Sequence, residues 1–366
     1  MLDLEKFNEN GRIRFAQKKD IPAIMKFIEE YWASNHILAH DREIFEFQYV
    51  YGDEVCFVLN EDQETGEIDS VLGYIPYGTE GDRDIFTAIW KVNKSSGFMQ
   101  GTELICYLEK YGRCKNLYCV GLASRAVSIM KYLRKKIADF EHYYRLNPTV
   151  KEYRIAEIHT FPEGFPGQQG ATGQPQSAEK PQTPDMPEGV ATQAQFERVS
   201  EFAQVEQMLA KGSEERFPYK TPSYVKKRYF EHPEYEYDKW HIRLDGKEAL
   251  LVCRVQEAAG SRVYRVIDCL GDLGCIAGCG KLLEQIFTEA DYEYADCLVC
   301  GMDESLMKAA GFTRKSEEDG NIIPNYFEPF EKRNVTIHNF MPKNVDTVMF
   351  KGDGDQDRPN FRKRKA

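Results

Sequence analysis

Apolar residues in the first half of the chain follow two spacings, one typical of strands and one typical of helices. Residues 84–93 and 116–123 are short, largely apolar runs rich in branched and aromatic side chains, as in buried strands. Residues 99–112 repeat their apolar positions with the period of an amphipathic helix. The pattern predicts this order: strand 84–93, helix 99–112, strand 116–123, helix 124–136 and strand 139–147.

The second half repeats this order at a separation of about 180 residues, which suggests that one αβ unit is used twice. Its predicted elements are strand 262–270, a glycine-rich turn at 271–280, helix 281–290, strand 294–301, helix 304–312 and a closing segment at 321–330. The residues that correspond are Gly101 with Gly280, Gly121 with Gly301, Met130 with Met307, and Tyr144 with Tyr326. Chance similarity of two generic strand–helix patterns is the alternative. Alternating strands and helices predict an α/β or α+β class with a mixed sheet in each half.

Residues 163–195 separate the halves and are dominated by Gly, Pro and Gln, so they cannot build a core. We expect a flexible linker here, because structureless loops of this length are uncommon inside one compact domain. The expected organisation is an N-terminal domain at 1–162, the linker at 163–195, a C-terminal domain at 196–350 and an Asp-rich, then basic, tail at 351–366.

The composition is that of a folded protein, since 42% of the residues are hydrophobic and 13% aromatic. The net charge of −11 disfavours general nucleic-acid binding. No run of apolar residues is long enough to span a membrane. Asp3 and Glu5 stand where a signal peptide needs basic residues, so we expect a cytoplasmic protein.

Ten cysteines lie mostly among apolar residues, which indicates buried, reduced thiols. The pairs Cys275–Cys279 and Cys297–Cys300 come close to a zinc-ribbon spacing. Residues 294–300 read as a strand, however, where positions three apart point to opposite faces. We therefore expect no metal site.

A strand that leads through glycines into a helix can bind an anion, because the first amides of the helix point outward and carry partial positive charge. Gly278-Cys279-Gly280-Lys281 has this form in the second half, and Gly97 and Gly101 remain of it in the first. The alternative is that these glycines only allow tight packing of the helix on the strand. Neither turn matches the dinucleotide fingerprint or the P-loop.

The order of strand, Gly-x-Gly turn, helix, buried strand, helix and last strand resembles the GNAT acyltransferase superfamily. Nearly the whole chain looks like a tandem of two such units. The segments 142–147, 323–330 and 350–360 resemble bacterial GNAT-like proteins associated with surface-polysaccharide or lipopolysaccharide biosynthesis.

This resemblance implies that the turn holds the diphosphate of an acyl-coenzyme A (acyl-CoA), the co-substrate. The positions so assigned are Cys275, Gly278, Cys279, Gly280 and Lys281 in the second half, and Gly97, Gln100, Gly101 and Thr102 in the first. The second half keeps both glycines, with Cys275 at the usual Gln or Arg position. In the first half Met99 replaces the first glycine, so the second turn is the better-kept one.

The superfamily often uses a tyrosine as the acid for the departing thiolate, and Met130 and Met307 stand in its place here. Other groups must then move protons. The candidate catalytic residues are Asp268, Tyr326 and Glu328 in the second half, and His142 and Tyr144 in the first. Alternation along a strand would put His142 and Tyr144 on one face. The alternative is that these tyrosines are core residues and His142 a surface partner.

The tail carries Asp353, Asp355 and Asp357 at the opening spacing of a calcium loop, but Arg358 stands where an EF-hand requires glycine. We expect these four residues to bind an amino group or sugar hydroxyls, or else to pair among themselves. The basic residues 362–365 suggest at most a weak contact with anionic lipid.

Together these features predict an acyl-CoA-dependent N-acyltransferase that acts on an amine of a small molecule, an amino sugar of surface-glycan biosynthesis. One alternative is a non-catalytic glycan-binding or assembly module built from degenerate GNAT folds. Another is an aminoacyl-transferase of the peptidoglycan-bridge type, which the net charge disfavours. The acyl group and the oligomeric state are left open.

Overall fold

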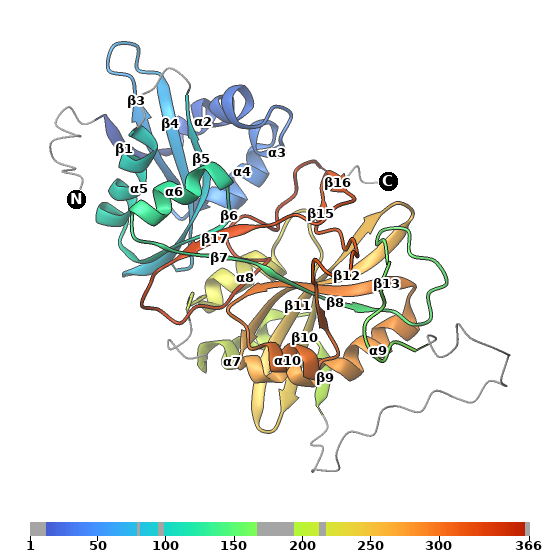
Figure 1. The fold of residues 1–366 in the computed structure, drawn as a ribbon. Helices are drawn as coiled ribbons and strands as arrows, with labels where there is room; N and C mark the ends of the chain where they lie inside the picture. Colours follow the sequence, from blue (N-terminus) through green and yellow to red (C-terminus); the bar gives the residue numbers. More distant parts are fainter. Residues whose placement is uncertain (1–11, 79–80, 94–98, 167–193, 212–216, 363–366) are drawn as a thin grey trace, which may run out of the picture. The chain divides into compact units, whose positions relative to one another are not determined.

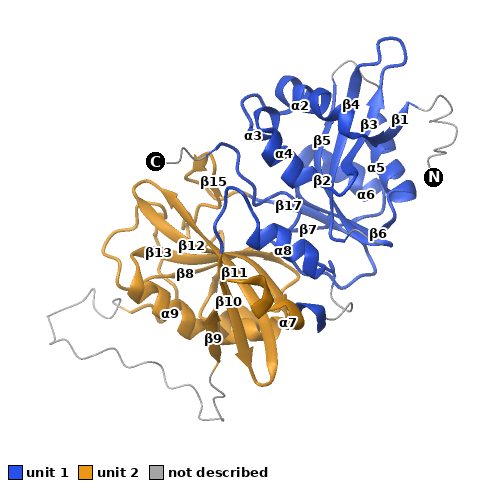
Figure 2. Cartoon of the chain, turned by 180° about the vertical axis from the view of Figure 1, so that it is seen from behind, with its two compact units in different colours: residues 1–140, 209–237, 336–366 blue, residues 141–208, 238–335 orange. Residues whose placement is uncertain are grey.

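A computed structural model describes residues 12–78, 81–93, 99–166, 194–211 and 217–362 (Figure 1). The chain forms two compact units, each built from more than one stretch of sequence (Figure 2). Unit 1 comprises residues 1–140, 209–237 and 336–366, and unit 2 comprises residues 141–208 and 238–335. Most of the predicted linker, residues 167–193, lies outside the described residues.

Unit 1 is a mixed sheet with helices packed against it. Its strands run in the order β1 (Ile13–Ala16), β3 (Glu54–Glu61), β4 (Ile68–Pro76), β5 (Arg83–Val92), β6 (Cys114–Leu122), β17 (His338–Met341) and β7 (Lys136–Asp139), with β2 (Val50–Tyr51) paired to β3. Only the β5–β6 pair in this series is parallel. The short strand β18 (Met349–Phe350) also belongs to unit 1.

The helical segments of unit 1 are η1 (Lys18–Asp20), α2 (Ile21–Phe27), η2 (Ile28–Trp32), α3 (Ile37–His40), α4 (Arg42–Tyr49), α5 (Gln100–Tyr111), η3 (Ser124–Ala126), α6 (Val127–Tyr132) and α8 (Pro222–Phe230). Helix α5 shows why they form where they do. Leu104 and Leu108, one turn apart, share its buried face with Ile105. Burying each of these side chains contributes about 2 kcal/mol.

Unit 2 has a sheet with the same kind of order. Its strands are β14 (Thr313–Arg314), β8 (Glu141–Leu146), β13 (Tyr292–Cys300), β12 (Ser261–Gly271), β11 (Lys247–Ala258), β10 (Asp238–Leu244) and β9 (Gln195–Arg198), in that order. Here β12 and β13 form the parallel pair. A separate hairpin joins β15 (Tyr326–Phe327) to β16 (Phe330–Glu331). The helical segments are η4 (Phe202–Gln204), α7 (Glu206–Lys211, whose first residues belong to unit 2), η5 (Leu273–Gly278), α9 (Cys279–Glu289) and α10 (Glu304–Ala309).

Each sheet contains one strand from the other half of the chain. Strand β8 follows β7 directly in sequence, yet it lies in unit 2 between β14 and β13, antiparallel to both. Strand β17 comes near the end of the chain and lies in unit 1 between β6 and β7, again antiparallel to both. The compact units are therefore not the contiguous ranges that the sequence suggested. Strands β8 and β17 each pair on both sides with strands of the sheet formed mainly by the other half of the chain.

The predicted alternation of strands and helices is confirmed in both halves. Strands 84–93 and 262–270 correspond to β5 and β12, and helices 99–112 and 281–290 to α5 and α9. The corresponding glycines Gly121 and Gly301 share the same left-handed backbone, with φ of +82° and +81°. Three boundaries were wrong. The helix from 124 ends at Tyr132, and the helix from 304 ends at Ala309. The strand predicted at 139–147 is broken at Phe140, the last residue of the first stretch of unit 1.

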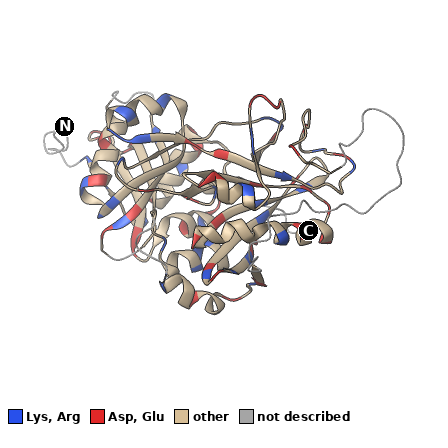
Figure 3. Ribbon diagram, turned by 60° about the horizontal axis from the view of Figure 1, so that its bottom comes forward, with Lys and Arg blue, Asp and Glu red and all other residues tan. Residues whose placement is uncertain are grey.

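None of the helices in the described ranges is long and apolar enough to cross a membrane. Basic and acidic residues are interspersed along the elements of both units (Figure 3).

Deleting residues 336–366 is expected to unfold unit 1. The deletion removes the strand between β6 and β7 together with Met349 and Phe350, both fully buried. Limited proteolysis and circular dichroism of the shortened chain should show rapid cleavage in residues 12–140 and a loss of structure. A chain that lacks only residues 363–366 is the control. Wild-type protease resistance of the shorter chain would contradict this role of β17.

Candidate functional site

The two parallel strands at the centre of unit 1 separate after a bulge. Leu72 pairs with Trp90 and Tyr74 with Thr87, so β5 carries an extra residue at positions 88–89 relative to β4. The parallel pairing of β5 with β6 ends at Thr87–Cys119, although both strands continue. A bulge bends a strand and increases its twist, which explains why β5 leaves β6 at this point.

Unit 2 has the same construction. Val252 pairs with Asp268 and Cys253 with Val266, so Ile267 is the extra residue of β12. The parallel pairing of β12 with β13 ends at Val266–Cys297. Past each bulge, backbone groups of the diverging strands no longer bond to each other, and an extended ligand that contains amides can use them.

The glycine-rich turn of unit 2 is helical and presents few free amides to an anion. Residues 273–278 form the 3₁₀ helix η5, which continues into α9, so the amides of this stretch are used inside the helices. Asp272 caps η5: its carboxylate accepts a hydrogen bond from the Gly274 amide at 2.8 Å, and its carbonyl accepts one from Cys275 at 3.1 Å. The carboxylate of Asp272 therefore occupies the beginning of η5, whereas α9 begins at Cys279 without a side-chain cap.

The five predicted residues of this turn are largely covered. Cys275 and Cys279 are buried, and a Cβ on Gly278 would lie 2.7 Å from the Ala194 side chain. Arg145 donates to the Gly280 carbonyl at 2.8 Å, and only Lys281 is exposed. The phosphate-binding role of this turn stays a prediction, and it requires the turn to open.

The corresponding turn of unit 1 is described from Met99 onward, and Gly97 lies outside the described residues. Gly101 packs under β5, because the Trp90 indole nitrogen donates to its carbonyl at 3.1 Å and would lie 2.9 Å from an added Cβ. Thr102 is buried in the first turn of α5. The Oε1 atom of Gln100 is buried with no hydrogen-bond partner among the residues that the structure describes, so a polar group arriving there would satisfy it.

The Asp-rich segment of the tail is buried in unit 1, and each carboxylate has a cation nearby. Asp353 accepts hydrogen bonds from the Tyr77 hydroxyl at 2.7 Å and pairs with Lys220 at 2.8 Å. Asp357 accepts from the Tyr237 hydroxyl at 2.8 Å, with Arg228 at 3.8 Å, and Asp355 pairs with Arg358 at 2.5 Å. The pairing expected as the alternative reading of this cluster is therefore present, with cations contributed by residues 209–237 as well as by Arg358.

Asp355 is the acidic residue of this segment that lies at the divergence of β5 and β6. Burial raises the pKa of Tyr49 well above its usual value, the charge of Asp355 raises it further, and the Ile89 amide in the bulge acts in the opposite direction. Burial raises the pKa of Cys119, the last paired residue of β6, to about 12, and Asp355 adds to this. The neighbouring Gln356 packs against Gly121, where a Cβ would lie 2.0 Å from its amide nitrogen.

Unit 2 holds a buried cluster of His142, Asp296 and Arg265. The Nε2 atom of His142 lies 2.9 Å from Asp296 Oδ2, and Arg265 binds the same carboxylate through Nε at 2.9 Å and Nη2 at 2.6 Å. Arg265 also donates to the carbonyls of Asn325 and Pro324. Burial alone would raise the pKa of Asp296, but the charge of Arg265 and the His142 hydrogen bond outweigh it and lower the pKa to about 2.

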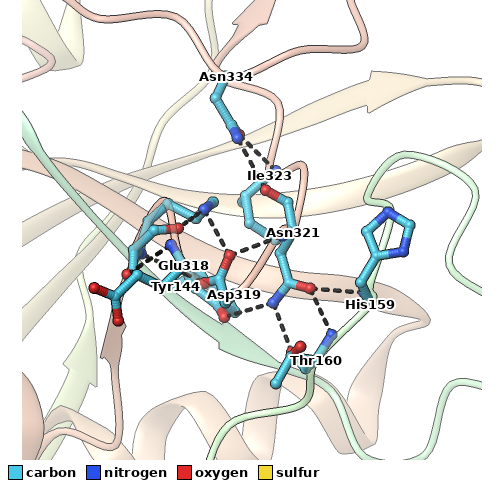
Figure 4. Close-up of polar contacts among 10 residues, drawn as sticks. Tyr144, His159, Thr160, Glu318, Asp319, Asn321, Ile323 and Asn334 are labelled. Carbon is cyan, nitrogen blue, oxygen red and sulfur yellow. Dashed lines mark hydrogen bonds and ion pairs between the residues drawn. The ribbon is translucent and has the colours of Figure 1, made fainter.

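Tyr144 lies on the same face as His142, as the alternation predicted. It pairs across the strands with Asp296, the residue that His142 bonds. Its hydroxyl accepts a hydrogen bond from Asn321 Nδ2 at 3.1 Å, within a network that also includes Asp319, His159, Thr160 and Asn334 (Figure 4). Burial raises the pKa of Tyr144, so the hydroxyl stays neutral. These contacts tie segment 315–323 to β8.

The other predicted catalytic residues occupy separate places in unit 2. Asp268 is fully buried on β12 just past the bulge, and its carboxylate accepts from the Cys269 amide at 2.9 Å. Tyr326 lies on β15 and Glu328 in the turn that follows it. Sequence reasoning missed Arg265 and Asp296, although both carry the signal that pointed to Asp268: a charged residue inside an apolar strand. Within the described ranges, no three His, Cys, Asp or Glu side chains are grouped to hold a metal ion.

Replacing Asp296 with Asn is expected to destabilise unit 2 by about 3–5 kcal/mol, because the change leaves the Arg265 charge buried without its partner. Urea unfolding measures the loss. Asp53→Asn, at a fully exposed ion pair, is the control and should leave stability nearly unchanged. Equal stability of the two variants would contradict this account.

The ion pair of Asp296 with Arg265 also predicts how the stability of the unmodified chain depends on pH. The folded pKa of Asp296, about 2, is below its unfolded value, so its contribution is present above the unfolded pKa and is lost as the pH falls toward 2. This lowering of the pKa of Asp296 corresponds to a stabilisation on the order of 2 kcal/mol. The unfolding free energy of Asp296→Asn should therefore depend less steeply on pH in this acidic range.

The sequence matches no protein-family model and no curated protein. Among solved structures, the GCN5-related N-acetyltransferase of Anabaena variabilis ATCC 29413 is similar over 90% of this chain and 72% of that one, with a TM-score of 0.51 and 9% identity. A probable N-acyltransferase of Enterococcus faecalis V583 (TM-score 0.49, 9% identity, 89% and 72% covered) is more distant. So is N-myristoyltransferase of Saccharomyces cerevisiae with bound myristoyl-CoA (TM-score 0.43, 10% identity, 96% and 84% covered). The two mixed sheets and their flanking helices thus have a GNAT-like, two-domain fold.

Proposed function

We propose that this protein is an N-acyltransferase that transfers an acyl group from acyl-CoA to an amine, and that unit 1 carries the reaction. The observation that carries the proposal is the bulge and divergence of β5 and β6 with the carboxylate of Asp355 beside them. Diverging strands offer a place for an extended thioester, and a carboxylate offers a partner for an amine. The GNAT-like fold supports this reading by analogy only.

Residues Gln100, Gly101 and Thr102 would hold the donor at the beginning of α5. This end of the helix carries partial positive charge, which favours a diphosphate, and the unsatisfied Gln100 side chain offers a further polar contact. When bound, acyl-CoA supplies an activated thioester. The turn of unit 2 is less suited, because η5 uses its amides and Asp272 caps it.

Asp355 would bind the acceptor ammonium group and take up its proton. Amine acylation needs a base, and a carboxylate within hydrogen-bond reach serves when it is held in place. Arg358 holds Asp355 through both its carbonyl and its carboxylate.

The acceptor we propose is an amino sugar in the cytoplasm, on the way to a surface glycan. Support comes from the resemblance of segments 142–147, 323–330 and 350–360 to proteins of that pathway and from the acidic residues of the last of these segments. Unit 2 would then be a second GNAT-like unit without the reaction. Its closed turn favours the alternative function of a binding or assembly module for that unit.

Isothermal titration calorimetry with acetyl-CoA tests the donor and its place. Gln100→Glu puts a negative charge at the beginning of α5 and should weaken binding at least about tenfold by repelling the diphosphate. Lys281→Glu makes the matching change in the first turn of α9 and should leave binding unchanged. Negative charge in the first turn favours a helix, and the melting temperature of each variant checks that it folds. Weakening by Lys281→Glu alone would place the donor in unit 2, and no binding by the unmodified chain would refute the proposed function.

Steady-state transfer from acetyl-CoA to glucosamine tests the base. Asp355→Asn should lower kcat by about 100-fold or more while the affinity for acetyl-CoA stays the same, because only proton uptake is lost. Asp84→Asn is the control, since Asp84 is also a buried carboxylate of unit 1, held by Asn116 and the Tyr219 amide. Equal loss of activity in both variants would assign the effect to folding.

A further inference from the structure

Unit 2 has an open groove of about 890 Å³ at the end of its sheet where the parallel strands β12 and β13 begin. The groove lies between the turn that joins β11 to β12 and the loop that follows β8, and Asp291, just before β13, also lines it. The bulge of β12, at Ile267, lies toward the opposite end of that strand. Small-molecule sites have volumes of roughly 300–1,000 Å³, so the groove admits a ligand much larger than an ion.

Buried side chains hold the loop that forms one wall of the groove. Asn147, which is fully buried, donates to the Tyr292 carbonyl at 2.8 Å and accepts from the Thr149 amide at 3.0 Å. The carboxylate of Glu293, 1% exposed, accepts a hydrogen bond from the Arg154 amide at 2.8 Å. These bonds fasten the loop to β13, so the groove is formed before a ligand arrives.

The charges that line the groove balance each other. They comprise three cations and three acids: Lys151, Arg154, Arg262, Glu152, Glu257 and Asp291. Arg154 Nε donates to Glu152 at 3.2 Å, and the other four side chains make no ion pair with any residue that the structure describes. A ligand with several charges of one sign would meet like charges here, which is costly, so the lining favours a neutral polar ligand.

Arg262 and Glu257 show that this hydrogen-bonding capacity is open. They lie opposite each other on β12 and β11, yet these two described residues form no ion pair. The Arg262 guanidinium lies 5.1 Å from the centre of the Tyr292 ring, and this cation–π contact orients it. Glu257 and Asp291 are exposed, so their carboxylates can accept hydrogen bonds from a ligand while Arg262 donates.

We infer that this groove binds a neutral oligosaccharide. Each sugar hydroxyl both donates and accepts a hydrogen bond, so one sugar ring can use a carboxylate and a guanidinium at the same time. Thr149 and Ser261 add hydroxyl groups to the lining. The groove shares no residue with the acyl-transfer site proposed in unit 1, so the inference goes beyond the proposed function and does not depend on it.

A peptide fits this groove less well than a sugar. Strands β11, β12 and β13 are each paired on both sides, so none of them offers an open edge to a peptide backbone. The apolar side chains in the lining are small, with Val150 the largest. A peptide would therefore find neither a strand partner nor a deep apolar pocket.

Isothermal titration calorimetry of the full chain with cellotriose, maltotriose and chitotriose is the first test. The unmodified chain should bind at least one of these trisaccharides with a Kd below about 1 mM. Glu257→Gln and Asp291→Asn should each weaken that binding about tenfold, because a neutral acceptor replaces a charged one. Glu317→Gln is the matched control, since Glu317 is an exposed acid of unit 2 outside the groove, and it should bind as the unmodified chain does.

Asp355→Asn distinguishes the groove from the acceptor site proposed in unit 1. This change should leave trisaccharide binding unaltered, and Glu257→Gln and Asp291→Asn should bind acetyl-CoA normally. Because the titration contains no acetyl-CoA, failure of the proposed acyl transfer would leave its result unchanged. Trisaccharide binding that is lost in Asp355→Asn but kept in Asp291→Asn would overturn the inference.

Crystals of the full chain soaked in the bound trisaccharide locate the site without any variant. Sugar density between residues 149–154 and 257–262 is the expected result. Sugar at another place, or no binding of any of the three trisaccharides, would overturn the inference. Binding of hexaglycine that depends on Glu257 and Asp291, without binding of a sugar, would overturn it as well and assign the groove to peptides.

Discussion

Each sheet of this protein has a place that its own half of the chain does not fill, between β6 and β7 in unit 1 and between β13 and β14 in unit 2. Open strand edges carry unpaired amides and carbonyls, so such a place must be filled. Strand β17 fills the first and β8 the second. The contents of both units depend on this exchange, because β8 brings His142 and Tyr144 into unit 2, and β17 is followed by the Asp-rich segment that is buried in unit 1.

Buried charge makes the exchanged segments specific. Asp353 meets Lys220, Asp357 meets Arg228, and Asp296 meets both Arg265 and His142. Ion pairs of this kind add little net stability compared with apolar packing, but removing one partner is costly. A strand in the wrong register, or the wrong segment in the same place, would bury these charges without partners.

Much of the fold was predictable from the sequence, because the elements of the αβ repeat are amphipathic or uniformly apolar and their periods are clear. The exchange of β8 and β17 was not, since the pattern of residues 141–146 marks a strand but not the sheet that it joins. The local conformation of the glycine-rich turn was not predictable from its glycines, because Asp272 is a strong cap and begins a 3₁₀ helix there. Arg265 and Asp296 could have been found, because a charge inside an apolar strand requires a partner.

The two units share the pairing pattern of their central strands but differ in the residues around it. Both keep the bulge and the divergence of the parallel strands, which follow from backbone pairing alone and survive changes of side chain. The segments before α5 and α9 differ more, since in unit 2 Asp272 caps the 3₁₀ helix η5 and the Ala194 side chain lies close to Gly278. Helix α5 of unit 1, like α9, begins without a side-chain cap and has Glu103 in its first turn, and the exchanged tail adds a carboxylate near the bulge. The two units thus share the architecture of their sheets, while the side chains around their diverging strands differ.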